Sequence, residues 1–164
     1  MLLNDDYLKT LTKRSMQALG GLIVHHYFEK HSKLTNEIQA LVLHQVSVLI
    51  KDNLLEWENI GATLPINGRG DPTPEDFKDI DKQLNNIPSK IVDASTEIGL
   101  CALYTSDHSE SLSFLDLLIN WTGFLEANTV DKEVFNKLPR GKGWGPTVSE
   151  LEYKYIIKNT IQNH

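Results

Sequence analysis

The chain has 164 residues, a net charge of −6 and 40% hydrophobic residues. That length and apolar content suffice for one domain with its own core, which excludes a disulfide-stapled mini-protein and a disordered chain, and no apolar run is long enough to span a membrane. The segment Asn4-Asp5-Asp6 carries two acidic residues at a position where a secretory signal has basic and then apolar residues. We therefore expect one globular cytoplasmic domain over residues 1–164.

Two long amphipathic helices are predicted in the first third of the chain. Over residues 5–31, apolar side chains recur at three- and four-residue spacing, the period of a helix that buries one face. Gly20 and Gly21 lie inside this helix and predict either a close neighbouring helix or a bend. A second helix is predicted from the capping pattern of Asn36 and Gln39 to about residue 59.

Helical patterns continue through the second half of the chain. Thr73-Pro74-Glu75 is typical of a helix start, and Pro88 of a helix end. Further helices are predicted from Ser89 to about 106, from about 109 onward, and over residues 129–138. The helix that begins near 109 is apolar over a wide arc, and we expect it to be the most buried. A last helix is predicted from Ser149, which forms a capping pattern with Glu152.

Segments 64–72 and 139–146 are rich in glycine and proline and are predicted to be long loops. No internal repeat is present. The sequence therefore predicts an all-α, single-domain helical bundle of about five to seven helices with two long Gly/Pro-rich loops.

Negative charge is concentrated in the middle of the chain. Residues 61–128 carry 11 acidic and four basic groups, whereas residues 129–164 carry an excess of two positive charges. Because phosphate binding needs clustered Lys and Arg, nucleic-acid binding is disfavoured and a basic protein partner is favoured. The same acids would also serve as a solvated face that keeps the protein soluble. The densest acidic group comprises Asp71, Glu75, Asp76, Asp79 and Asp81.

The loop at 139–146 combines two cations and an aromatic side chain: Arg140, Lys142 and Trp144. Three interpretations stay open. Trp and Arg dominate binding hot spots, so the loop would contact a protein partner; its backbone amides and cations would form an anion nest; or Trp144 would pack into the bundle and leave the cations in solvent.

Two polar groups have the residue types of a metal site. His25 and Glu29 stand four residues apart on one helix, and His44 on the next helix would have to approach them. The acids Asp76, Asp79 and Asp81, with Asp93 and Glu97 on the next predicted helix, resemble the paired acids with which helical nucleotide pyrophosphatases hold magnesium. The spacing departs from the Glu-x-x-Glu pattern of those enzymes. The single Cys101 has no cation within three positions and is expected to be a buried small residue.

No catalytic motif or cofactor site is recognised in the chain. The favoured hypothesis is a non-enzymatic protein-binding module, in one concrete version a bacterial immunity or antitoxin-type inhibitor that covers a basic toxin with an acidic surface. The alternative is a helical-bundle enzyme or small-ligand binder of the metal-dependent nucleotide hydrolase type. A third hypothesis is a structural bundle that forms a homodimer.

Overall fold

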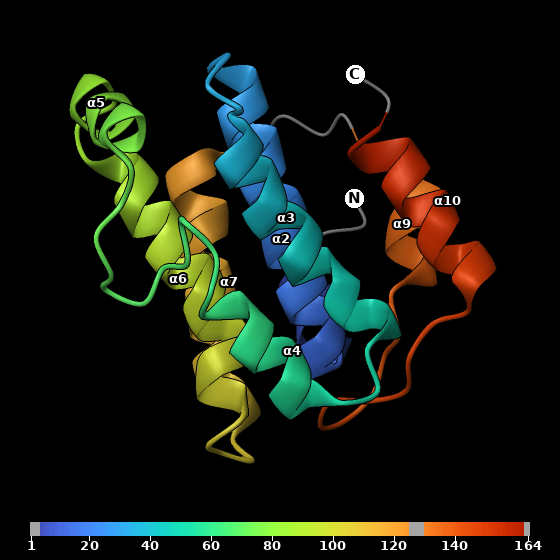
Figure 1. Ribbon diagram of the computed structural model, residues 1–164. Helices are drawn as coiled ribbons and strands as arrows, with labels where there is room; N and C mark the ends of the chain where they lie inside the picture. Colours follow the sequence, from blue (N-terminus) through green and yellow to red (C-terminus); the bar gives the residue numbers. More distant parts are fainter. Residues whose placement is uncertain (1–3, 125–129, 163–164) are drawn as a thin grey trace.

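A computed structural model shows an all-helical bundle (Figure 1). It describes residues 4–124 and 130–162, in which we find nine α-helices, one 3₁₀ helix and no strand. The predicted all-α class is confirmed, and the helices outnumber the expected five to seven because two predicted long helices are interrupted. The elements are α1 (Asp5–Thr10), α2 (Lys13–Lys30), α3 (Asn36–Ser47), η1 (Val48–Ile50), α4 (Leu54–Gly61), α5 (Glu75–Gln83), α6 (Ile87–Ala102), α7 (His108–Thr122), α9 (Lys132–Lys137) and α10 (Glu150–Thr160).

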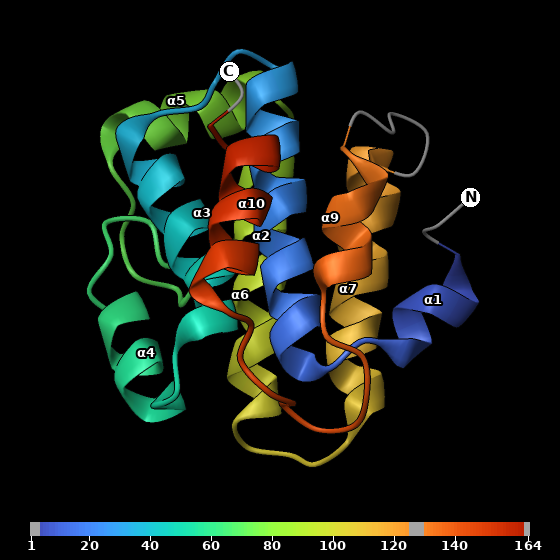
Figure 2. The same ribbon diagram turned by 90° about the vertical axis from the view of Figure 1, so that its right-hand side faces the viewer.

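Helix α2 is the central element of the bundle (Figures 1 and 2). It packs against α3, α6 and α7, and 15 of its 18 residues are buried. Helix α7, expected to be the most buried, buries only five of its 15 residues. The expectation for α7 was wrong because its wide apolar arc includes Leu117 and Trp121, which face solvent.

The two glycines inside α2 allow neighbouring helices to come close. A Cβ atom at Gly20 would lie 2.7 Å from Cδ1 of Ile98 on α6, and one at Gly21 would lie 3.0 Å from Cγ2 of Val46 on α3. Ordinary Cβ contacts are longer, so neither position has room for a larger residue without a shift. The predicted close approach is confirmed, and α2 runs through both glycines without a break.

The helix predicted over residues 5–31 is two helices. Leu11 and Thr12 are extended, and Thr12 caps α2 by accepting a hydrogen bond from the Ser15 amide at its Oγ1 (3.1 Å). The Thr12 amide donates to the Pro139 carbonyl (3.3 Å) and the Lys13 amide to the Gly143 carbonyl (2.8 Å). Contacts with a loop more than 120 residues away thus stabilise the break, and apolar periodicity does not reveal them.

The helix predicted over residues 36–59 is also interrupted. It ends at Ser47, passes through η1, and resumes after Asn53, whose Oδ1 accepts from the Glu56 amide (3.0 Å). The buried guanidinium of Arg14 donates to the carbonyls of Val48 and Lys51. Carbonyl groups at the interruption are therefore bonded by a side chain of α2.

The boundary between α5 and α6 differs from the prediction. Helix α5 ends at Gln83, and Asn85 and Asn86 adopt positive φ angles of 56° and 59°. Helix α6 then begins at Ile87 with Pro88 in its first turn, where a missing N–H costs nothing. Ser89 was expected to cap this helix, but it lies inside α6.

The C-terminal elements follow the prediction closely. Helix α9 lies within predicted residues 129–138, of which Thr129 is outside the described residues. Ser149 caps α10 by accepting from the Glu152 amide (3.1 Å), as predicted. The long segments before α5 and before α10 contain no helix. In the described ranges, no helix is long and apolar enough to cross a membrane.

Candidate functional site

Helix α5 turns its acidic residues outward. Phe77 and Ile80 are its buried residues, and they attach the helix to the core. Glu75, Asp76 and Asp79 are all exposed. Because Phe77 and Ile80 are three residues apart and share the buried face, the carboxylates on the other faces of the helix are left to solvent.

Several carboxylates of the predicted site have local partners. Asp71 accepts from the Asn67 side-chain amide (2.7 Å), and Asp81 accepts from the Ser89 amide in the first turn of α6 (2.9 Å). Glu75 pairs with Lys78 at 2.7 Å, and that hydrogen bond and charge lower the pKa of Glu75. Asp71 and Asp81 therefore contribute to local structure as well as to the negative field.

Two further carboxylates, Asp93 and Glu97, extend the negative charge along α6. Burial raises the pKa of Asp93, and the nearby charge of Asp81 raises it further. Burial likewise raises the pKa of Glu97, with Glu110 as the next cause. The positive charge of Arg69 opposes part of the shift of the Glu97 pKa. We call the following residues of α5 and α6 the acidic surface: Glu75, Asp76, Asp79, Asp81, Asp93 and Glu97.

The sequence analysis placed Asp93 and Glu97 in a metal site together with Asp76 and Asp79. In residues 4–124 and 130–162, no group of three or more His, Cys, Asp or Glu side chains is arranged to hold a metal ion. The histidine site considered in the sequence analysis is not formed either. His25 and Glu29 lie 3.2 Å apart, whereas His44 stacks on Trp57.

The loop at 139–146 lies at the other end of the bundle from α5 (Figures 1 and 2). The predicted site residues therefore do not form one continuous surface. Trp144 is half-buried, with its ring centroid 6.5 Å from that of Trp57, and the Arg140 guanidinium lies 5.0 Å from the centre of the Tyr7 ring. Lys142 is exposed. This geometry corresponds to the interpretation in which Trp144 packs into the bundle.

Cys101 is half-buried, and its burial raises the pKa of the thiol. Its sulfur lies 3.4 Å from the Ser111 hydroxyl. A raised thiol pKa disfavours the reactive thiolate, in keeping with the expected structural role.

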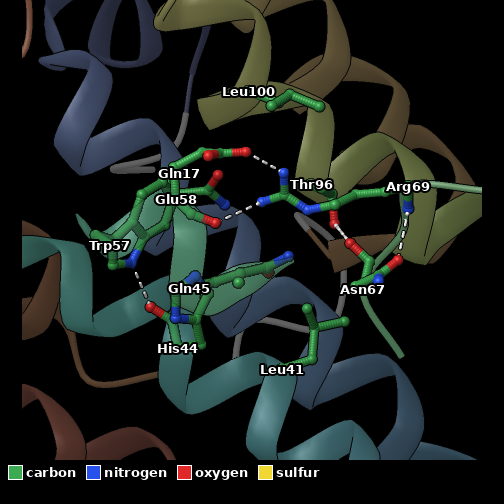
Figure 3. A pocket seen from close by; sticks show the side chains of 11 residues that line it. Gln17, Leu41, His44, Gln45, Trp57, Glu58, Asn67, Arg69, Thr96 and Leu100 are labelled. Atoms are coloured by element: carbon green, nitrogen blue, oxygen red, sulfur yellow. Dashed lines mark hydrogen bonds and ion pairs between the residues drawn. The ribbon is translucent and has the colours of Figure 1, made fainter. Parts of the chain in front are cut away.

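A polar pocket that the sequence analysis missed lies where α2, α3, α4 and α6 meet the segment after α4 (Figure 3). Arg69 in that segment forms an ion pair with Glu58 of α4, and the side chains of both are largely buried. Trp57 and His44 form one wall. The pocket has a volume of about 10 Å³.

Two buried glutamines line this pocket, and both are hydrogen-bonded to Ser95. The side-chain amide of Gln17 donates to the Ser95 carbonyl (3.0 Å), and that of Gln45 donates to the Ser95 hydroxyl (2.9 Å). Thr96 donates to the Asn67 carbonyl (3.0 Å), which fixes the segment over α6. These hydrogen bonds thus join α2, α3 and the segment after α4 to α6.

Burial lowers the pKa of His44 to about 4, with the positive charges of Arg69 and Lys51 as further causes. His44 is therefore neutral at physiological pH. A neutral imidazole, two amides and a compensated ion pair give the pocket little net charge, unlike the acidic surface.

Comparison of the chain with protein-family models, with curated proteins and with solved structures finds no match.

Proposed function

We propose that the protein is a non-enzymatic binding module that covers a basic protein partner with the acidic surface of α5 and α6. The observation that supports this proposal most is the cluster of exposed carboxylates on α5, formed by Glu75, Asp76 and Asp79. Burial is the largest cause of the raised pKa values of Asp93 and Glu97, and the charge of Asp81 adds to the first and that of Glu110 to the second. A cationic partner would relieve the part of these shifts that comes from repulsion between carboxylates.

The exposed acids of α5 suit the first encounter with such a partner. Asp76 and Asp79 project from a helix that is anchored through Phe77 and Ile80, so their position is fixed by the core. A fixed cluster of one charge steers an oppositely charged protein and raises its association rate. Binding through this surface is expected to weaken steeply as salt increases.

The finer form of the proposal is a bacterial immunity or antitoxin-type inhibitor. A nuclease toxin must bind phosphate and so has a cationic cleft, which an acidic helical surface of this kind complements. The expected result of binding is inhibition by blocking that cleft, with no chemistry performed by this chain.

The test uses the intact protein, immobilised in native lysate at about 50 mM and about 500 mM salt, which differ strongly in charge screening. We expect capture of one basic protein at low salt only. Purified partner should bind Asp76→Lys/Asp79→Lys with at least about tenfold lower affinity. The control Glu150→Lys/Glu152→Lys makes the same charge change on α10, away from α5, and should bind as well as the wild type.

Circular dichroism would verify that both double variants fold. Equal loss of affinity in the two would contradict the proposal, because only net charge would then matter. Capture of an acidic partner would also contradict the proposal. So would a partner that stays bound at high salt and binds the α5 double variant as well as the wild type. If the captured protein is a nuclease whose activity the chain leaves intact, the inhibitor form is wrong while the binding-module form stands.

A further inference from the structure

The pocket beside Trp57 contains four buried polar atoms that have no hydrogen-bond partner in the part of the chain that the structure describes. They are Gln17 Oε1, Gln45 Oε1, His44 Nε2 and Arg69 Nε. Gln17 is fully buried and Gln45 is 2% exposed. Buried polar atoms in native proteins are almost always satisfied by protein or by an ordered ligand, so four such atoms around one pocket point to an occupant.

The hydrogen-bonding character of the four atoms restricts the occupant. The amide nitrogens of Gln17 and Gln45 are both engaged at Ser95, so the amide oxygens remain as acceptors. Arg69 Nε–H is a donor only, and the neutral His44 ring can offer Nε2 as donor or acceptor. A complementary molecule must donate two hydrogen bonds and accept at least one.

Charge and size exclude most other occupants. An ammonium ion has no acceptor for Arg69 Nε–H and would be repelled by the guanidinium. An anion would face two amide oxygens and the carboxylate of Glu58, which the ion pair holds beside the pocket. A volume of about 10 Å³ admits one water-sized molecule and nothing larger.

We propose that this pocket is a binding site for one water-sized neutral molecule, water itself in solution, that connects α2 and α3 to the segment carrying Arg69. Water supplies two donors and two acceptors, which matches the four atoms. The ion pair between Arg69 and Glu58 closes the site, and its opening sets the rate at which the bound water exchanges. This proposal does not rest on the proposed function.

The first test counts long-lived waters by oxygen-17 magnetic relaxation dispersion on the intact protein. We expect Gln45→Met to contain one fewer long-lived water than the wild type, because it loses an acceptor in the pocket. The matched control Gln39→Met makes the same change on α3 outside the pocket lining and should leave the number unchanged. An unchanged number in Gln45→Met would overturn the proposal.

The second test does not depend on the stability of the Gln45 variant. Arg69→Met removes the ion pair and should shorten the residence time of one water at least tenfold, whereas Arg140→Met, which changes a side chain over the Tyr7 ring outside the pocket lining, should not. Titration with ammonium chloride, followed at the Trp57 indole N–H resonance, should give no saturable shift beyond that of sodium chloride. A saturable ammonium shift would mean that the site binds a cation, and equal residence times in the two arginine variants would rule out closure by the ion pair.

Discussion

His44 and Trp57 are stacked with their ring centroids 4.8 Å apart and an angle of 7° between the ring planes. The indole N–H of Trp57 also donates to the backbone carbonyl of His44 at 2.9 Å. The two contacts together fix α4 against α3 on the far side of the interruption at residues 48–53. The position of the polar pocket therefore depends on this pair.

Trp57→Phe should destabilise the protein by about 1–2 kcal/mol, since it loses one hydrogen bond and part of a buried aromatic surface. Urea denaturation followed by circular dichroism measures the change. Trp121→Phe is the matched control on a side chain that is 37% exposed, and it should cost less than about 0.5 kcal/mol. Equal effects at the two tryptophans would show that the stacked pair contributes nothing special.

Stability should fall as the pH drops from about 6.5 towards 4 because of His44. The pKa of His44 is lowered to about 4 by burial, below the value of about 6.5 in an unfolded chain. The unfolded state therefore binds the proton first, and the stabilisation present above pH 6.5 is lost progressively in this window. His44→Gln should show a shallower fall between these pH values than the wild type, as measured by urea denaturation at each pH, and an equal fall in the two proteins would contradict this assignment.

Gly20→Ala should destabilise the protein by about 1–2 kcal/mol, because the added methyl group overlaps Cδ1 of Ile98. The overlap exceeds the gain in helix propensity, which is about 1 kcal/mol. Ile98→Val removes the overlapping atom, so Gly20→Ala should cost less in that background. A double-mutant cycle by urea denaturation tests this, and strict additivity would mean that the two side chains do not meet.

Arg14→Met should destabilise the protein by about 3 kcal/mol, since two carbonyl groups lose charged hydrogen bonds. Burial lowers the pKa of Arg14, and nearby Asp52 opposes that shift. Thermal unfolding compares this variant with Lys30→Met, an exposed change on the same helix that should have little effect. A small loss at Arg14 would show that water replaces the guanidinium at residues 48–51.

Local patterns predicted the helical class and most helix positions, but the interruptions were missed for two different reasons. The break at Leu11 and Thr12 depends on the carbonyls of Pro139 and Gly143, which no local pattern contains. The break before α4 had a local signal, because Asn53 and Glu56 form a capping pattern. The strong apolar periodicity through residue 57 outweighed that signal.

The candidate sites were predictable to different degrees. The acidic residues Glu75, Asp76 and Asp79 could be placed on the solvent side of α5 from their spacing relative to Phe77 and Ile80. The loop residues Arg140, Lys142 and Trp144 were grouped with them, although the fold places the two regions at opposite ends. The polar pocket was missed because its lining comes from five separate segments. Its one sequence signal was polar Gln45 on the apolar face of the second predicted helix.

The hydrogen bonds from the start of α2 to the loop before α10 affect the order in which the chain can fold during synthesis. The amides of Thr12 and Lys13 donate to the carbonyls of Pro139 and Gly143, so these bonds cannot form until residues 139–143 have left the ribosome. Until then these two amides at the start of α2 lack their hydrogen-bond acceptors. We expect nascent chains that stop before residue 139 to remain sensitive to proteolysis near residues 11–13, and full-length chains to resist it.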